Sequence, residues 1–530
     1  MRKISDEEEN EIYNIIKTAL YSLCEAKPKD PVEYLARKML NLVEDQNSNP
    51  SIFRESILER KQTIGTDNLV MKVQNVVMET LAEPFLEKYK ILEKIRGEVY
   101  LAQDLKVPEL KKAVKIIDKE KSDMYGISEN TLDTIINLDH PNVIKIYEIF
   151  EDENHLYIVE EYCECGDLFN FLLNNKIFSE DLVKVIIKQL LEALVYLHGK
   201  GIVHSNIHPE NILIYGQYDN TNILDVVIKI SDFATASLFS NKRNKSNNKL
   251  FSTQYYFAPE VIESNYNEYC DIWSVGAITY TLLCGKPPFD GKPYEVLFQI
   301  LHDNYEFTTF HSETAKNFIS SLMNKNIHKR MNAKDALNHV WLEKDKILGN
   351  FEENVGVEIL NKISNFVIGK SLRRSILSYI QSKKYYTEKN IDLLKLFKQI
   401  DQDGNGLLEV SEIYDKYGKF FPGTPKEAWD KVKLFVERID INNNGVIEYS
   451  EFLTISSLIN KEVNYNMLKE AFDFYDTDRN GYIQASDLKE IFEDTDVKDE
   501  YLQYLIDEND SNNDRKISFQ EFYEIITKNN

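Results

Sequence analysis

Four stretches in the last third of the chain carry oxygen-bearing side chains at one repeated spacing. Each begins with Asp, has Asp or Asn two and four residues later, and ends eleven residues later in Glu or Asp. Twelve-residue loops with oxygen donors at positions 1, 3, 5, 7, 9 and 12 bind Ca²⁺. The predicted ligands are Asp401, Asp403, Asn405, Leu407, Glu409 and Glu412; Asp440, Asn442, Asn444, Val446, Glu448 and Glu451; Asp476, Asp478, Asn480, Tyr482 and Asp487; Asp510, Asn512, Asp514 and Glu521.

These loops follow the EF-hand pattern, and they differ in quality. The first fills the pattern completely, and the second does so with fewer charges, so its affinity should be somewhat lower. The third ends in Asp487, whose shorter side chain should lower the preference for Ca²⁺ over Mg²⁺. In the fourth, Arg515 stands where glycine belongs; the required positive φ costs about 1 kcal/mol, and its cation repels the ion. We therefore predict two helical EF-hand lobes over residues 389–530, with the fourth site weak or empty.

A second group of chemically capable residues lies in the middle of the chain. The stretch 202–214 contains His204, Asn206 and Asn211 between apolar runs, and Asp232 follows a second apolar run. It resembles the catalytic loop of protein kinases, which keeps an aspartate at the position of Asn206 to accept the substrate hydroxyl proton. An amide has no basic lone pair at neutral pH, so Asn206 can orient a hydroxyl but cannot take its proton.

The resemblance to protein kinases continues in order through residues 86–343, and within them it is closest to the calcium-dependent protein kinases. It rests on five further stretches and on Arg330, which the family pairs with the residue matching Glu260. The fold implied is a bilobal kinase domain. The matching stretches are Asp139-His140-Pro141-Asn142, Gly166-Asp167-Leu168-Phe169, Ala258-Pro259-Glu260, Asp271-Ile272-Trp273-Ser274-Val275-Gly276 and Pro287-Pro288-Phe289.

The same resemblance assigns a nucleotide site to four residues: Lys115, Asn211, Asp232 and Gly97. Several neighbouring positions depart from the family pattern. The glycine-rich hairpin retains only Gly97, Thr131 matches the position of the helix glutamate that pairs with the strand lysine, His208 replaces a lysine, and the carboxylate of Glu160 stands in the adenine pocket. Glu129 would take the place of the helix glutamate only if the alignment contained a local gap.

Three interpretations of the function remain open on these observations. The first is a calcium sensor of the calcium-dependent protein kinase type whose phosphoryl transfer is lost or very weak, acting as a Ca²⁺-switched scaffold. It would bind a protein partner through its kinase-like surface and hold Mg²⁺ and ATP weakly. The alternative is an active Ca²⁺-dependent serine/threonine kinase with an atypical catalytic loop. A third, structural reading is an anchoring protein insensitive to calcium.

The first fifty residues contain two apolar stripes of helical period, over 12–23 and 32–43, separated by two prolines. The string Asp30-Pro31-Val32-Glu33-Tyr34-Leu35-Ala36 resembles the dimerisation/docking module of the type II regulatory subunit of cAMP-dependent protein kinase. The resemblance implies a homodimer that receives an amphipathic anchoring helix. The other interpretation is a helical hairpin packed on the kinase-like domain. Residues 51–85 form a linker.

Residues 344–388 form a junction with a basic, apolar helix that resembles the autoinhibitory junction of calcium-dependent protein kinases. A basic amphipathic helix beside an acidic calcium lobe is a suitable intramolecular target, and a plain connecting helix is the alternative. The whole chain carries a net charge of −24, which argues against a nucleic-acid partner and suits cation binding. Five cysteines without paired spacing, no secretory segment and no long apolar run predict a cytoplasmic protein with no membrane span.

Overall fold

The computed structural model describes residues 85–342, Leu360 and residues 371–527. Within these it leaves aside 106–107, 109–110, 120–128, 153, 176–177, 216–225, 234–236, 239–253, 264, 308–311, 384–390, 421–422, 460–464 and 492–498. The chain divides into two compact units, Met1–Leu69 and Val70–Asn530, and all that follows concerns the second. The predicted N-terminal hairpin and nearly all of the 51–85 linker lie outside the described residues.

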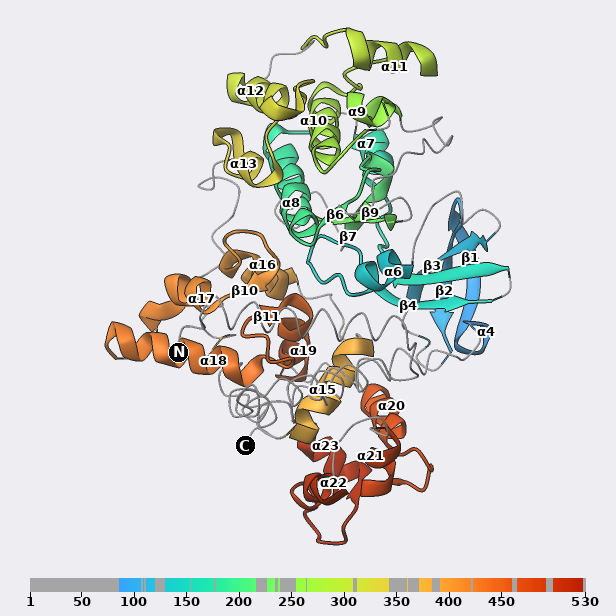
Figure 1. Cartoon of the computed structure of the whole chain (residues 1–530), viewed down its shortest axis with the longest axis vertical. Helices are drawn as coiled ribbons and strands as arrows, with labels where there is room; N and C mark the ends of the chain where they lie inside the picture. Colours follow the sequence, from blue (N-terminus) through green and yellow to red (C-terminus); the bar gives the residue numbers. More distant parts are fainter. Residues whose placement is uncertain are drawn as a thin grey trace, which may run out of the picture. The chain divides into compact units, whose positions relative to one another are not determined.

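A five-stranded antiparallel sheet forms the small lobe, in the order β1-β2-β3-β5-β4 (Figure 1). Burial is greatest in β3 and β5, whereas β1 is exposed along most of its length. Phe85, Tyr89 and Phe150 pack together beneath the sheet, with ring centroids 5.6–6.0 Å apart. Its elements are α4 (Phe85–Lys88), β1 (Tyr89–Arg96), β2 (Val99–Asp104), β3 (Lys111–Asp118), α6 (Glu129–Ile136), β4 (Ile146–Glu151) and β5 (His155–Glu161).

The large lobe is built around two helices, α8 and α10. Helix α8 begins where the side chain of Ser179 accepts a hydrogen bond from the Leu182 amide, and its apolar face is buried. Helix α10 is buried along nearly its whole length. At Gly276 an added Cβ would lie 2.6 Å from the side chain of Met323, so close packing requires glycine there. The helices are α7 (Leu168–Asn175), α8 (Glu180–Gly199), α9 (Pro259–Ile262), α10 (Tyr269–Cys284), α11 (Pro293–His302), α12 (Glu313–Leu322) and α13 (Ala333–Leu337).

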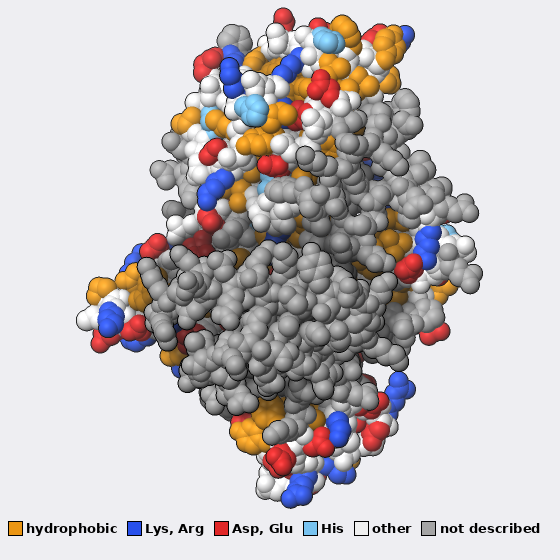
Figure 2. Space-filling view, viewed as in Figure 1, with side chains coloured by type: hydrophobic (Ala, Val, Ile, Leu, Met, Phe, Trp, Pro, Cys, Tyr) orange, Lys and Arg blue, Asp and Glu red, His pale blue; other side chains and the backbone are white. Residues whose placement is uncertain are grey.

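Short strands and 3₁₀ turns connect these helices and carry the residues of the cleft. Strand β7 pairs antiparallel with β8, and β6 pairs with β9. The segments are β6 (Ile202–Val203), η2 (Pro209–Asn211), β7 (Ile212–Tyr215), β8 (Val227–Ile230), β9 (Ser237–Leu238), η5 (Gln254–Tyr256), η6 (Ile327–Lys329) and η7 (Val340–Leu342). The outer helix α11 exposes Tyr294 and Phe298 (66% and 58%). Figure 2 shows apolar side chains at the top of the view, where Figure 1 places α11.

The C-terminal region consists of four helix–loop–helix units in two pairs. Each pair is joined by a short antiparallel ladder, β10 with β11 and β12 with β13. The elements are α16 (Ile391–Ile400), β10 (Leu407–Leu408), α17 (Val410–Tyr417), η9 (Gly418–Phe420), α18 (Pro425–Ile439), β11 (Ile447–Glu448), α19 (Tyr449–Ile459), α20 (Tyr465–Tyr475), β12 (Tyr482–Ile483), α21 (Ala485–Ile491), α22 (Asp499–Asp507), β13 (Ile517–Ser518) and α23 (Phe519–Thr527).

Helix α15 (Ser371–Lys383) is the part of the predicted junction for which side-chain contacts are described. It packs against α19 of the first pair and against α20 and α23 of the second. Leu372, Ile376 and Tyr379 are buried, and the Tyr379 ring stacks on Phe474 with centroids 4.3 Å apart. The basic helix is therefore held by both calcium lobes through its apolar side chains.

The predicted fold class is confirmed for the kinase-like domain and the EF-hand lobes, whereas its N-terminal hairpin lies outside the described residues. Among the residues that the structure describes, no helix combines the length and the apolar character needed to cross a membrane.

Candidate functional site: the cleft and the calcium loops

The loop around Asn206 keeps the backbone organisation of a kinase catalytic loop. The buried carboxylate of Asp271 accepts hydrogen bonds from the amides of His204 (3.0 Å) and Ser205 (2.8 Å). His204 donates its Nε2–H to the Ser231 carbonyl oxygen at 3.0 Å, which joins this loop to the segment carrying Asp232. Ser205 and Asp232 both have positive φ, 62° and 68°. The scaffold that would present a catalytic base is therefore assembled.

The groups that this scaffold presents are two amides. The side-chain N–H of Asn211 donates to the backbone oxygen of Asn206 at 3.0 Å. Because the amide nitrogen is the donor in this contact, the side-chain oxygen of Asn211 is the atom that could bind a metal ion. The backbone N–H of Asn206 donates to Nδ1 of His204 at 3.3 Å. Asn206 thus lies in the position from which a carboxylate would act, and its side chain cannot accept a proton.

His208 does not replace the charge of the lysine expected at its position. It is 5% exposed, and its Nδ1 has no hydrogen-bond partner among the described residues. Burial lowers the pKa of His208 to about 3, so the imidazole is neutral at physiological pH. Phosphoryl transfer relies on cations that neutralise the developing negative charge, and this loop does not supply one.

Lys115 and Asp232 face each other across the cleft. Lys115 Nζ lies 2.5 Å from Oδ1 of Asp232, so the ammonium contacts the carboxylate that would hold a metal ion. Glu160 lies on β5 opposite Ala113, two residues from Lys115 on β3 and on the same face of the sheet. The backbone of α6 begins at Glu129 and includes Thr131, but the side chains of these two residues lie outside the described set.

The Glu160 carboxyl should destabilise the folded protein at high pH. Burial raises the pKa of Glu160 to about 7, Lys115 opposes the increase, and Asp232 adds to it. Since the folded pKa exceeds the ordinary value of 4.5, the cost is absent below about pH 4.5 and complete above about pH 7. We expect Glu160→Gln to stabilise the protein by about 1–2 kcal/mol at pH 8, because the amide must still be desolvated, and hardly at pH 5.

Thermal unfolding at the two pH values measures this difference, and Glu164→Gln, at an exposed position of the same segment, is the matched control. An equal gain from Glu160→Gln at both pH values would show that the buried charge is not the cause.

The hairpin above the cleft is short. Arg96 pairs with Val99, so β1 and β2 are joined by only two residues, Gly97 and Glu98. Gly97 has a φ of +54°, which favours glycine in such a turn. Such a turn exposes few amides to a triphosphate. Arg96 Nη1 donates to Oδ2 of Asp167 at 3.0 Å, and Nη2 contacts the Glu210 carboxylate.

The calcium loops share one backbone feature at position 6. In each, the amide at this position donates to the aspartate at position 1: Gly406 to Asp401, Gly445 to Asp440, Gly481 to Asp476 and Arg515 to Asp510, at 2.6–2.9 Å. Arg515 adopts a φ of 60° in place of glycine. The apolar residues at position 8 are all buried to 1% exposure or less: Leu408, Ile447, Ile483 and Ile517.

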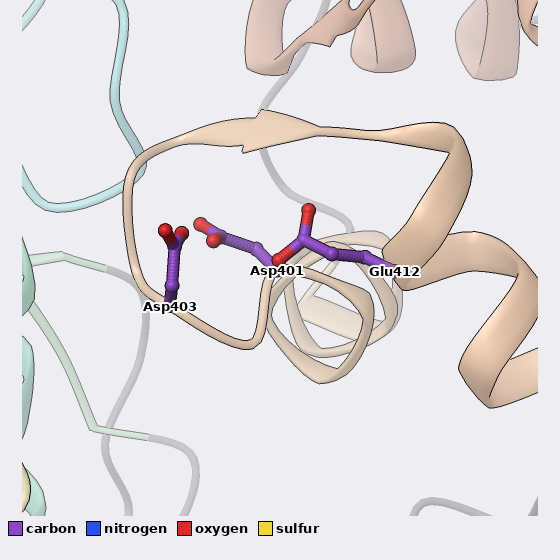
Figure 3. Close-up of side chains that lie close together, drawn as sticks. All are labelled: Asp401, Asp403 and Glu412. Carbon is purple, nitrogen blue, oxygen red and sulfur yellow. The ribbon is translucent and has the colours of Figure 1, made fainter.

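The carboxylates converge in the first and third loops. One oxygen each of Asp401, Asp403 and Glu412 lies within 4.8 Å of the others, and the same holds for Asp476, Asp478 and Asp487. Figure 3 shows the three carboxylates of the first loop directed toward the inside of the loop. Such a group of hard oxygen donors fits Ca²⁺.

The position-12 residues divide the four loops. Burial raises the pKa of Glu412 and Glu451. In the first two loops a bound cation would therefore stabilise the ionised form of the position-12 carboxylate. In the fourth loop, burial alone would raise the pKa of Glu521, but hydrogen bonds from Ser518 and Ser511 outweigh it and lower the pKa. Both serine hydroxyls donate to this carboxylate at 2.8 Å. The fourth carboxylate is already satisfied by protein donors.

Calcium binding to the first loop should release a proton. Burial raises the pKa of Asp401 to about 8, the Gly406 amide opposes the shift, and Glu192, Glu412 and Asp403 add to it. At pH 7 the metal-free carboxyl is therefore protonated, and it must ionise to bind Ca²⁺. We expect affinity at this loop to fall as pH decreases below 8, by up to about tenfold per pH unit.

Calorimetric calcium titrations in two buffers of different ionisation enthalpy count the released protons. Identical heats in both buffers would contradict this assignment.

The first calcium pair also contacts the kinase-like domain, at α8 and at the segment between α6 and β4. Lys398 Nζ lies 2.9 Å from Oε2 of Glu192 on α8, and the Ser450 amide at the start of α19 donates to Oδ2 of Asp139 at 2.9 Å. An added Cβ at Gly406 would lie 2.7 Å from the His140 ring, so the loop itself packs against this domain.

Comparisons with known proteins agree with this geometry. The protein kinase domain model matches residues 95–342, and the EF-hand domain pair model matches 391–457 and 465–527. Calcium-dependent protein kinase 4 of Plasmodium falciparum (isolate 3D7) is 33% identical over 470 residues, covering 84% of this chain and 87% of the relative. The chain belongs to the calcium-dependent protein kinase family.

Other members of the calcium-dependent protein kinase family match over similar lengths. Calcium-dependent protein kinase 5 of Plasmodium falciparum (isolate 3D7) is 33% identical over 461 residues, covering 83% of this chain and 77% of the relative. Calcium-dependent protein kinase 3 of Plasmodium berghei (strain Anka) is 32% identical over 444 residues, covering 81% and 77%. Ca²⁺ is thus the expected metal of this chain, and Mg²⁺ and ATP are the cofactors typical of its family.

The structure brings together most residues singled out in the sequence, and it adds some. Lys115 and Asp232 meet, Asn206 and Asn211 are hydrogen-bonded, and the carboxylates of the first and third calcium loops converge. The contacts of Arg96 were missed. The available signal was a cation directly before Gly97, where the hairpin should widen to receive phosphate.

Proposed function

We propose that this protein is a Ca²⁺-switched scaffold of the calcium-dependent protein kinase type, in which phosphoryl transfer is lost or very weak. The observation that carries the proposal is the side chain of Asn206. It stands in a catalytic loop whose supporting hydrogen bonds to Asp271 and Ser231 are all made, yet it offers an amide instead of a base. Loss of a general base lowers the rate by roughly 10²–10⁴-fold.

Further departures support the same proposal, because they affect other parts of the transfer machinery. The two-residue turn at Gly97 weakens the grip on phosphate, and neutral His208 removes a cation. The buried Glu160 carboxylate disfavours an adenine ring beside it. The alternative is an active serine/threonine kinase in which Lys115, Asn211, Asp232 and Gly97 hold MgATP.

The calcium half of the proposal assigns the ligands to the four loops as predicted, with the fourth weak. When Ca²⁺ fills the first two loops, it binds their buried carboxyl groups in the ionised form, and the lobes hold α15. Burial of Leu372 and Ile376 and the 2.8 Å hydrogen bond between Ser375 and Tyr475 support this role for the helix. Capture and release of α15 would then change what the kinase-like surface binds.

We also propose a cytoplasmic location, a protein partner for the kinase-like surface, and a homodimer at residues 1–50 that receives an amphipathic anchoring helix. The net charge of −24 supports a partner other than nucleic acid.

Hydrogen exchange with and without Ca²⁺ tests the switch. We expect Ca²⁺ to protect α15 and α19 in the wild type and not in a Glu412→Gln/Glu451→Gln double variant. If the hydrogen-exchange rate of α15 is the same with and without Ca²⁺, the proposed switch is wrong, and a calcium-insensitive anchoring protein is favoured.

A further inference from the structure

One side chain of the small lobe joins two segments of the large lobe. Arg96, the last residue of β1, donates from Nη1 to Oδ2 of Asp167 at 3.0 Å and to the Glu210 backbone oxygen at 3.3 Å. Its Nη2 pairs with the Glu210 side-chain carboxylate. The two acceptors lie 71 and 114 residues away in the sequence, so the contact joins the end of β1 to two segments of the large lobe.

The short hairpin places the guanidinium there. Because Arg96 pairs directly with Val99, the cation lies at the very end of β1, beside the turn at Gly97. A longer turn would carry backbone amides to this place.

The acceptors are held in position by their own contacts. Asp167 also accepts hydrogen bonds from the Asn170 amide (2.8 Å) and side chain (3.1 Å), and its side chain is only 8% exposed. Glu210 lies in η2, between the catalytic loop and β7. The guanidinium therefore binds one carboxylate, that of Asp167, which other contacts of the large lobe already hold in place.

A second link lies deeper in the cleft. Lys115 on β3 contacts Asp232, which follows β8, at 2.5 Å. Each link joins a strand of the small lobe to a loop of the large lobe. Together they pair Arg96 and Lys115 with carboxylates of the large lobe.

We propose that Arg96 is a latch, which holds the β1–β2 hairpin on the large lobe and keeps the cleft shut. A triphosphate-sized ligand can enter only after both of its ion pairs are broken. The Arg96 side chain is 46% exposed and that of Glu210 26%, so solvent screens this ion pair and breaking it costs little free energy. It does not depend on whether the cleft transfers phosphate.

Hydrogen exchange on the full-length protein in excess Ca²⁺ tests the latch. We expect Arg96→Ala to increase exchange about fivefold in residues 89–104 and in residues 204–212, because the hairpin and the loop are released together. Lys90→Ala removes an exposed cation from the same strand and should leave both segments unchanged.

A second variant separates release of the latch from local damage to the hairpin. Glu210→Gln removes one of the two ion pairs and should produce a smaller increase than Arg96→Ala in the same two segments, and the double variant should show no increase beyond that of Arg96→Ala, since Glu210 acts through Arg96. The proposal is wrong if hydrogen exchange in Arg96→Ala equals that of the wild type, or if the increase is confined to residues 89–104. It is also wrong if the effects of the two substitutions add in the double variant.

Discussion

Replacing Glu451 with glutamine is expected to weaken calcium binding at the second loop by about 30-fold to 1,000-fold. Glu451 is fully buried, with Oε1 accepting from the Ile441 amide at 2.9 Å and Oε2 from the Glu448 amide at 2.9 Å. Both oxygens therefore have fixed positions for bidentate coordination. Removing one unit of charge near the ion costs about 2–4 kcal/mol at the dielectric constant typical of partly buried sites.

Glutamine keeps the shape of the side chain, so the effect isolates the charge. A calcium titration by calorimetry measures it, and Glu437→Gln, at an exposed position on the preceding helix, is the matched control. Unchanged affinity in Glu451→Gln would mean that the second loop does not bind calcium through this residue.

Replacing Arg330 with alanine is expected to destabilise the large lobe by about 3–5 kcal/mol, because it leaves the Glu260 carboxylate buried and unpaired. Arg330 is 4% exposed, and both of its terminal nitrogens contact Glu260. It also donates to the backbone oxygens of Tyr269 (2.8 Å) and Asn324 (2.9 Å). The ion pair joins α9, which carries Glu260, to the segment that follows η6, which begins with Arg330.

Urea unfolding monitored in the large lobe gives this loss, and Lys329→Ala supplies an exposed neighbouring cation as the control. A loss below about 1 kcal/mol, as for a surface ion pair, would show that the domain does not depend on this contact. The prediction also bears on function, because a protein that acts as a scaffold must keep the fold of its kinase-like domain even when it no longer transfers phosphate.

The local parts of this protein were predictable from sequence. The calcium ligands lie within twelve consecutive residues, so their spacing specifies the loop, and the sequence also shows that the glycine-rich hairpin retains only Gly97. Contacts between distant segments were not predictable in the same way. The partners of Arg96 lie 71 and 114 residues away, and the Asp139–Ser450 hydrogen bond spans 311 residues. Only the folded chain brings such groups together.

The fourth calcium loop shows the same division. Arg515 at a glycine position predicted a poor site from sequence. The second reason, that hydroxyls of Ser511 and Ser518 already satisfy the Glu521 carboxylate, required the structure. Sequence patterns identify ligands, whereas competing protein donors become visible only in three dimensions.

The central claim is that calcium sensing is kept while phosphoryl transfer is lost. Incubation of the purified full-length protein with MgATP, excess Ca²⁺ and a mixture of serine and threonine peptides tests it most directly, with Asp232→Ala as the reference. We predict no incorporation of phosphate above that of Asp232→Ala. Ca²⁺-dependent incorporation that disappears in Asp232→Ala would contradict the claim and establish the alternative, an active kinase.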